Sequence, residues 1–164
     1  MSDRFPGSIQ IGGTIRRVHL PYLVGCLSDD GASQEYGDKA IDSDCSETEL
    51  MEYLKEGVLE FCNDQAHNGE FERTEDFCVE HDIAFHRWSD HCCEYDAEIA
   101  DFRPGMNSCV VRYSDSNANE IVCGKTVRQA MTVLKLGEVD EALQILAAAC
   151  PAGPEALQPV IFVE

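Results

Sequence analysis

The sequence predicts an α+β fold, with a mixed or antiparallel sheet of the split βαβ (ferredoxin-like) kind and helices on one face. Three observations favour this class. The chain has 164 residues, of which 44% are hydrophobic, enough for one domain with its own core. Helix-type and strand-type periodicities follow one another along the chain. In the middle, two strand-like segments are joined by a short turn, which indicates hairpins rather than a parallel sheet.

The first elements are predicted from apolar spacing. Residues 8–15 (SIQIGGTI) alternate in polarity up to two glycines and predict a strand. Residues 18–27 place apolar side chains at helical spacing, with Pro21 in the first turn, where its missing N–H costs little. The polar residues 32–45 fit a loop with a short edge strand.

A second helix is expected where Ser46 and Glu49 form a capping box, and Gly57 is expected to end it. Residues 58–62 (VLEFC) predict a strand, followed by a turn at 63–69.

The next helix spans residues 70–81, with Phe71, Thr74, Phe77 and Cys78 on its inner face. Residues 83–88 and 92–102 then predict two strands joined by a turn at 89–91.

The C-terminal part predicts an extension. Residues 109–113 and 120–124 indicate a second β-hairpin, and two helices follow at 126–136 and 138–150 around Gly137. A last strand is expected at 159–163. We therefore divide the chain into an acidic α+β core, residues 1–106, and a hairpin and helix-pair extension, residues 107–164, packed as part of one domain.

The helix pair has a leucine-glycine turn at Leu136-Gly137 and the sequence Glu141-Ala142-Leu143 in its second helix. In these features residues 134–149 resemble one helix-turn-helix unit of the tetratricopeptide repeats. Such units need about three copies to bury a core, and the pattern occurs once, so the resemblance implies no peptide-binding function.

Net charge is the strongest global signal. The formal net charge is −19, and residues 26–101 carry 23 acids against four bases, whereas the segments on either side are nearly neutral. A charge of this size repels phosphate groups, which argues against direct binding of nucleic acid or of an anionic membrane surface. A basic protein surface, cations and simple solubility remain as explanations.

The acids recur on the exposed faces of predicted elements. On the strand 92–102, alternate acids lie on one face about 6.6 Å apart, and the helix 70–81 adds a second row. Fixed charges at this spacing could occupy a surface that normally holds nucleic acid. The residues expected to bind a partner are Glu72, Glu75, Asp76, Glu80, Glu94, Asp96 and Glu98.

A zinc site is the alternative for the same region. Zinc takes four nitrogen or sulfur ligands in a tetrahedron, often as close pairs from two elements. The possible ligands are Cys78, His81, His91, Cys92 and Cys93. Adjacent cysteines on a strand point to opposite faces, so that only one of Cys92 and Cys93 could join His91. No second pair at zinc-finger spacing occurs in the sequence.

The sequence thus predicts a small non-enzymatic interaction protein that binds a basic protein surface and inhibits a DNA- or RNA-binding protein as a nucleic-acid mimic. An enzyme whose site is assembled from distant residues, without a recognisable motif, also remains open. The nine cysteines are expected to be reduced, and the N-terminus has no signal-peptide pattern. We therefore expect a cytoplasmic protein without a cofactor. Its oligomeric state is not predicted.

Overall fold

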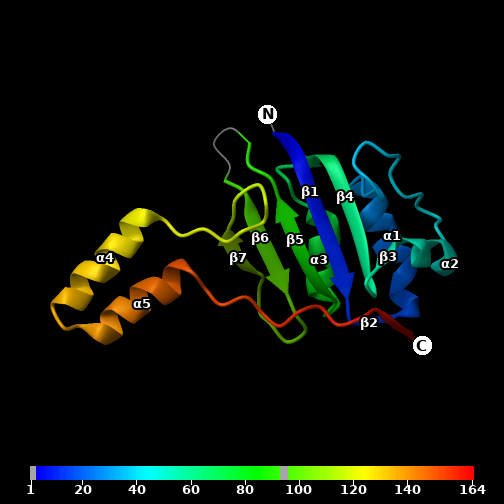
Figure 1. The fold of residues 1–164 in the computed structure, drawn as a ribbon. Coiled ribbons are helices and arrows are strands. Elements are labelled where there is room, and N and C mark those ends of the chain that lie inside the picture. Colours follow the sequence, from blue (N-terminus) through cyan, green and yellow to red (C-terminus); the bar gives the residue numbers. More distant parts are fainter. Residues whose placement is uncertain (1–2, 93–95) are drawn as a thin grey trace.

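The computed structural model describes residues 3–92 and 96–164, and its main feature is a six-stranded antiparallel sheet with the strand order β3-β4-β1-β5-β6-β7 (Figure 1). The strands of this sheet are β1 (Arg4–Gly12), β3 (Leu54–Lys55), β4 (Val58–His67), β5 (Ala84–Ser89), β6 (Glu98–Phe102) and β7 (Val110–Tyr113). The α+β class predicted from the sequence is confirmed.

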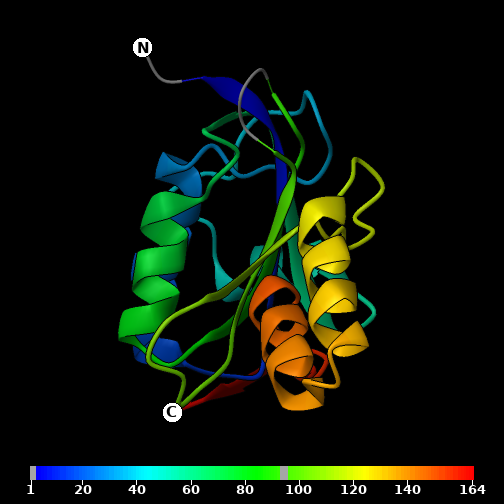
Figure 2. The same cartoon turned by 90° about the vertical axis from the view of Figure 1, so that its left-hand side faces the viewer.

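Two α-helices form a layer on one face of this sheet, α1 (Leu20–Asp29) and α3 (Glu72–Glu80) (Figure 2). Beneath them β1 alternates buried and half-buried residues, because successive side chains on a strand point to opposite faces. The core between helices and sheet is formed by fully buried aliphatic and aromatic side chains, among them Ile9, Ile11, Leu23, Leu27, Phe61, Phe71, Phe85 and Phe102.

The connections place β1 in the middle of the sheet. Helix α1 connects β1 to β4, and α3 connects β4 to β5, so that β4 and β5 flank β1 on its two sides. In the sheet β4 lies between β3 and β1, and β1 lies between β4 and β5. The finer prediction of a ferredoxin-like split βαβ arrangement stays a prediction.

Asp30, at the end of α1, fixes the start of α3. Its carboxylate accepts hydrogen bonds from the backbone N–H and the hydroxyl of Thr74, both at 2.8 Å. An acid at this position satisfies N–H groups that have no partner within the helix and complements the helix dipole. The two helices of the layer are thereby joined at this end.

The predicted capping box of Ser46 and Glu49 is confirmed at the start of α2 (Glu47–Leu50), but the helix is shorter than expected. A 3-10 turn η2 (Met51–Tyr53) and β3 follow it. Gly57 does not end the helix. Together with Glu56 it has positive φ and forms the tight turn between β3 and β4, as two-residue hairpins require.

Three strand boundaries differ from the predictions. Residues 63–67, expected as a turn, continue β4, because β1 supplies pairing partners as far as His67. Residues 32–45 form no strand among the described residues, only the bridge of Ser33 with Cys62. Of the predicted second β-hairpin only an isolated antiparallel bridge between Ser114 and Glu120 forms: residues 120–124 are not a strand, and β7 pairs with β6 on its other edge.

The C-terminal part leaves the six-stranded sheet and ends in a separate two-stranded sheet. Helices α4 (Gly124–Lys135) and α5 (Val139–Ala149) form a hairpin beyond the β7 edge (Figure 1). The chain then runs back to β8 (Ile161–Val163), which pairs in parallel with β2 (Thr14–Arg16), next to the 3-10 turn η1 (Arg17–His19). The predicted division of the chain into a core, residues 1–106, and an extension, residues 107–164, stays a prediction.

In the part of the chain that is described, no helix has the length and apolar character needed to cross a membrane.

A substitution at Gly69 tests how tightly the turn between β4 and α3 is packed. It has φ of +71°, and an added Cβ would overlap the ring of Phe5 and the side chain of Ser89. We expect Gly69→Ala to lower the free energy of unfolding by about 2–5 kcal/mol, from left-handed strain plus overpacking. Gly37→Ala is the matched control, since Gly37 also has positive φ but open space around it. Its cost should be about 1–2 kcal/mol in urea denaturation; equal losses for both variants would contradict the packing argument.

Candidate functional site

A buried arginine joins the helical layer to the sheet. Arg87 on β5 is 2% exposed, and its Nε lies 2.8 Å from Oε1 of Glu75 on α3. Its other side-chain nitrogens bond Glu98 on β6 and the hydroxyl of Ser89. Burial raises the pKa of Glu75, and the positive charge of Arg87 opposes this rise. Glu75 and Glu98 therefore serve an internal ion-pair network, where a guanidinium group can satisfy two carboxylates.

This network divides the predicted partner-binding residues into two groups. Glu72, Asp76 and Glu80 are exposed along the outer side of α3, and Asp96 is exposed just before β6. Glu75 and Glu98 are half-buried and face Arg87. Glu94 lies outside the described residues. The structure thus brings the α3 acids together as one row, whereas Glu98 does not extend it.

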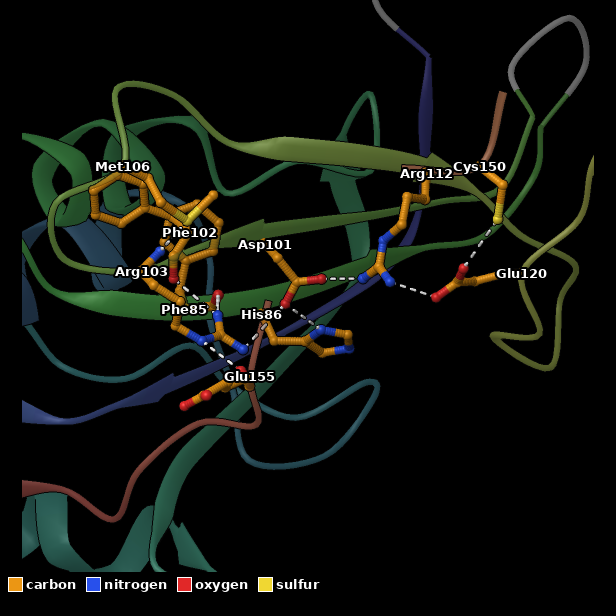
Figure 3. Close-up of polar contacts among 10 residues, drawn as sticks. All are labelled: Phe85, His86, Asp101, Phe102, Arg103, Met106, Arg112, Glu120, Cys150 and Glu155. Atoms are coloured by element: carbon orange, nitrogen blue, oxygen red, sulfur yellow. Dashed lines mark hydrogen bonds and ion pairs between the residues drawn. The ribbon is translucent and has the colours of Figure 1, made fainter. Parts of the chain in front are cut away.

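A second polar cluster lies on the sheet face opposite α1 and α3. Its centre is Asp101 on β6, whose side chain is 3% exposed (Figure 3). Asp101 lies 2.9 Å from Nδ1 of His86 and 3.3 Å from the guanidinium group of Arg103, and it also pairs with Arg112. Burial alone would raise the pKa of Asp101. The hydrogen bond with His86 and the charges of Arg112 and Arg103 outweigh burial and lower this pKa below its usual value.

The same cluster holds the chain that returns from α5. The Arg103 Nε donates to the carbonyl of Glu155 at 2.9 Å, and its Nη1 donates to the carbonyls of Phe85 and Phe102 (Figure 3). Gly153 lies so close to the guanidinium group of Arg112 that a side chain there would overlap it. Residues 151–158 are therefore held across this face by the two arginines.

A hollow of about 290 Å³ lies beside the cluster. Its lining is Gln10, His86, Asp101, Arg103, Arg112, Pro154, Ala156 and Leu157. A carboxylate that holds one imidazole nitrogen can orient a histidine as a general base. Here, however, both arginines direct their nitrogens to the chain's own oxygen atoms, so the contacts favour a structural role, the attachment of residues 151–158.

Sequence reasoning missed this cluster, although a signal existed. Asp101 falls on the face of the strand 92–102 that was expected to be apolar, in register with Ile99. Arg87 likewise lies within the apolar segment 83–88. A charged residue at an inward position indicates a buried partner, but the sequence does not show which residue that is.

The alternative zinc ligands lie at two separate places. Cys78 is fully buried on the inner side of α3, where burial raises the pKa of its thiol well above the usual value. His81 stacks on His19 at a ring distance of 4.3 Å. His91 and Cys92 follow the opposite end of β5, which a six-residue strand places about 20 Å away.

His91 Nδ1 lies 2.9 Å from the hydroxyl of Ser116 and 3.0 Å from Asp90. Cys93 lies outside the described residues. Among residues 3–92 and 96–164, no three histidine, cysteine or acidic side chains are arranged to hold a metal ion.

Comparison with known proteins gives no relative: no family model, no curated protein and no solved structure matches this chain.

Asp101 provides a test with a defined pH dependence. A carboxyl group whose folded pKa is lowered stabilises the protein above its unfolded pKa, and this contribution is lost as the pH falls through the folded pKa. At pH 7 we expect Asp101→Asn to lower the free energy of unfolding by about 3–5 kcal/mol, because Arg103 and Arg112 lose their shared buried anion. Below about pH 4 the loss should begin to shrink, because Asp101 of the unfolded chain takes up its proton there, and it should vanish only below the lowered pKa of folded Asp101.

Urea denaturation of the wild type and of Asp101→Asn would measure this difference, at pH values from 7 down to the pH at which the wild type unfolds without urea. A destabilisation that stays constant over the whole range would show that the charge of Asp101 does not contribute to stability.

Proposed function

We propose that this chain is a non-enzymatic interaction protein whose acidic surface binds a basic protein surface, most concretely in competition with nucleic acid. The observation that carries this proposal is that most lysines and arginines are already paired with acids of the chain itself. Each of the seven lysines and arginines from Arg17 to Arg112 forms an ion pair with the chain's own acids. Among the described residues, most of the exposed acids form no ion pair with a lysine or arginine.

The row on α3 supports this proposal most directly. Glu72, Asp76 and Glu80 are spaced i, i+4 and i+8, about 6 Å apart along the helix axis. No lysine or arginine of the described chain forms an ion pair with any of the three. The row therefore winds round the outer side of α3 by about 40° per step, and its carboxylates form no ion pair with a base of the described chain.

Asp76 and Glu80 are unfavourable for the helix that carries them, whereas Glu72 lies in the first turn, where the helix dipole favours an acid. Like charges at i and i+4 repel each other, and Glu80 lies at the C-terminal end, where the helix dipole disfavours an anion. Each effect amounts to a few tenths of a kcal/mol. Acids that weaken their own helix are better explained by a contact outside the chain than by stability.

The other parts of the proposal rest on general chemistry. A net charge of −19 favours association with cationic surfaces and opposes direct contact with phosphates. Cys26, Cys62, Cys78 and Cys109 are free thiols in or near the core, which suits a reducing cytoplasm. The proposed function needs no cofactor.

Charge reversal on α3 tests whether this row is the contact. We expect Glu72→Lys/Asp76→Lys/Glu80→Lys to weaken binding of a fluorescent lysine-rich peptide by roughly tenfold or more, measured by anisotropy at low salt. The matched control is Glu35→Lys/Asp38→Lys/Glu52→Lys, which makes the same charge change at exposed acids elsewhere. The control should lose clearly less affinity, since only long-range attraction changes.

Equal losses in the two triple variants would mean that the acids form a uniform coat, and would contradict a specific α3 contact. Competition is the second readout: the wild-type protein should displace duplex DNA from a basic DNA-binding domain, and the α3 variant should not.

Neutralising part of the row should separate stability from binding. Because repulsion and the dipole both disfavour these acids, Asp76→Asn/Glu80→Gln should raise the free energy of unfolding by up to about 1 kcal/mol. The same variant should bind the lysine-rich peptide more weakly than wild type. Thermal denaturation and anisotropy measure the two effects, and a loss of stability would contradict the view that this row is kept for binding.

A further inference from the structure

The α4–α5 hairpin exposes more large apolar side chains than its own contacts cover. The two helices pack chiefly against each other, with Ala130 and Ala142 buried between them. Six larger side chains remain exposed at 37 to 58%: Val127, Met131, Leu134, Val139, Leu143 and Leu146. In Figure 1 the hairpin projects past β7, away from the helical layer formed by α1 and α3.

These six residues form two stripes with the same spacing. On α4 the positions are 127, 131 and 134, and on α5 they are 139, 143 and 146, so each stripe has a step of four residues and then of three. At about 100° per residue, each stripe stays within a sector of about 60°. Alternating steps of four and three are the pattern of a helix that packs lengthwise against another helix.

Both stripes lie on the same side of the hairpin. Each buried alanine precedes the central residue of its stripe by one position, so both stripes have the same angular offset from the α4–α5 contact. In an antiparallel pair, equal offsets bring the two stripes to one common face. We call these two stripes together the hairpin face. Two such faces packed against each other would form the core of a four-helix bundle.

Charge indicates what covers the hairpin face. Helix α4 carries Lys125, Arg128 and Lys135 and no acid, whereas α5 carries Asp140 and Glu141 and no base. Two copies related by a twofold axis parallel to the helices would place α4 of one copy opposite α5 of the other, so that basic and acidic helices meet. The face is self-complementary in both apolar spacing and charge.

The hairpin is also where a second acidic copy can approach. Residues 121–154 contain three bases and three acids and are neutral, although the whole chain carries −19. The helices have 12 and 11 residues, so the six residues of the hairpin face would form the centre of a contact along their whole length. We propose that two copies of this chain dimerise through their hairpin faces, as an antiparallel four-helix bundle that holds the two acidic bodies apart.

Sedimentation velocity of the full chain tests the proposal, which does not depend on the function of α3. Between about 1 µM and about 100 µM the wild type should change from monomer to dimer. Leu134→Glu/Leu143→Glu should raise the dissociation constant by about a hundredfold or more, because each dimer would bury four charges. The matched control Gln129→Glu/Gln144→Glu adds the same charge on the opposite, exposed side of the hairpin and should still dimerise.

Leu134→Ala/Leu143→Ala shows whether the glutamate variant fails only because its hairpin unfolds, since alanine favours helices. It should keep the helical circular dichroism of the wild type and still weaken the dimer, by about tenfold or more.

A wild-type chain that stays monomeric up to about 100 µM would overturn the proposal and leave the face to a different partner. A dimer that survives both leucine variants would overturn it as well, because the contact would then lie on another surface.

Discussion

The ion pairs of Arg87 with Glu75 and Glu98 are the interaction on which the architecture depends. They bring a residue of α3 and residues of two neighbouring strands together inside a chain that carries −19. Burying one cation between two anions is favourable only when hydrogen bonds satisfy all three groups, and the hydroxyl of Ser89 contributes one of them. The network fixes where α3 lies on the sheet, and thereby directs the remaining acids of that helix outward.

A similar arrangement organises the other face. Asp101 is a buried anion shared by two arginines and a histidine, and these arginines hold the segment that returns from the α4–α5 hairpin. Each sheet face therefore uses arginines to attach a neighbouring segment. The bases from Arg17 to Arg112 all form ion pairs with the chain's own acids, which leaves the body strongly acidic outside and the hairpin as its neutral, apolar projection.

Local patterns predicted much of the fold. The alternation in β1, the capping box of Ser46 and the apolar spacing of α1, α3, α4 and α5 each depend on residues close in sequence, and these elements are found near the predicted positions. The failures concern pairing. Residues 63–67 extend β4 because β1 lies beside them, and residues 120–124 contribute only the isolated bridge of Glu120 with Ser114.

The sequence by itself determined the class of fold, the concentration of acids in residues 26–101 and the apolar stripes of the last two helices, because composition and periodicity are properties of neighbouring residues. Only the tertiary structure decided which acids are available to a partner. Glu72 and Glu75 belong to one helix, yet one is exposed and the other meets Arg87 of β5. That difference depends on contacts between distant segments, because a buried charge requires a partner that the fold alone brings to it.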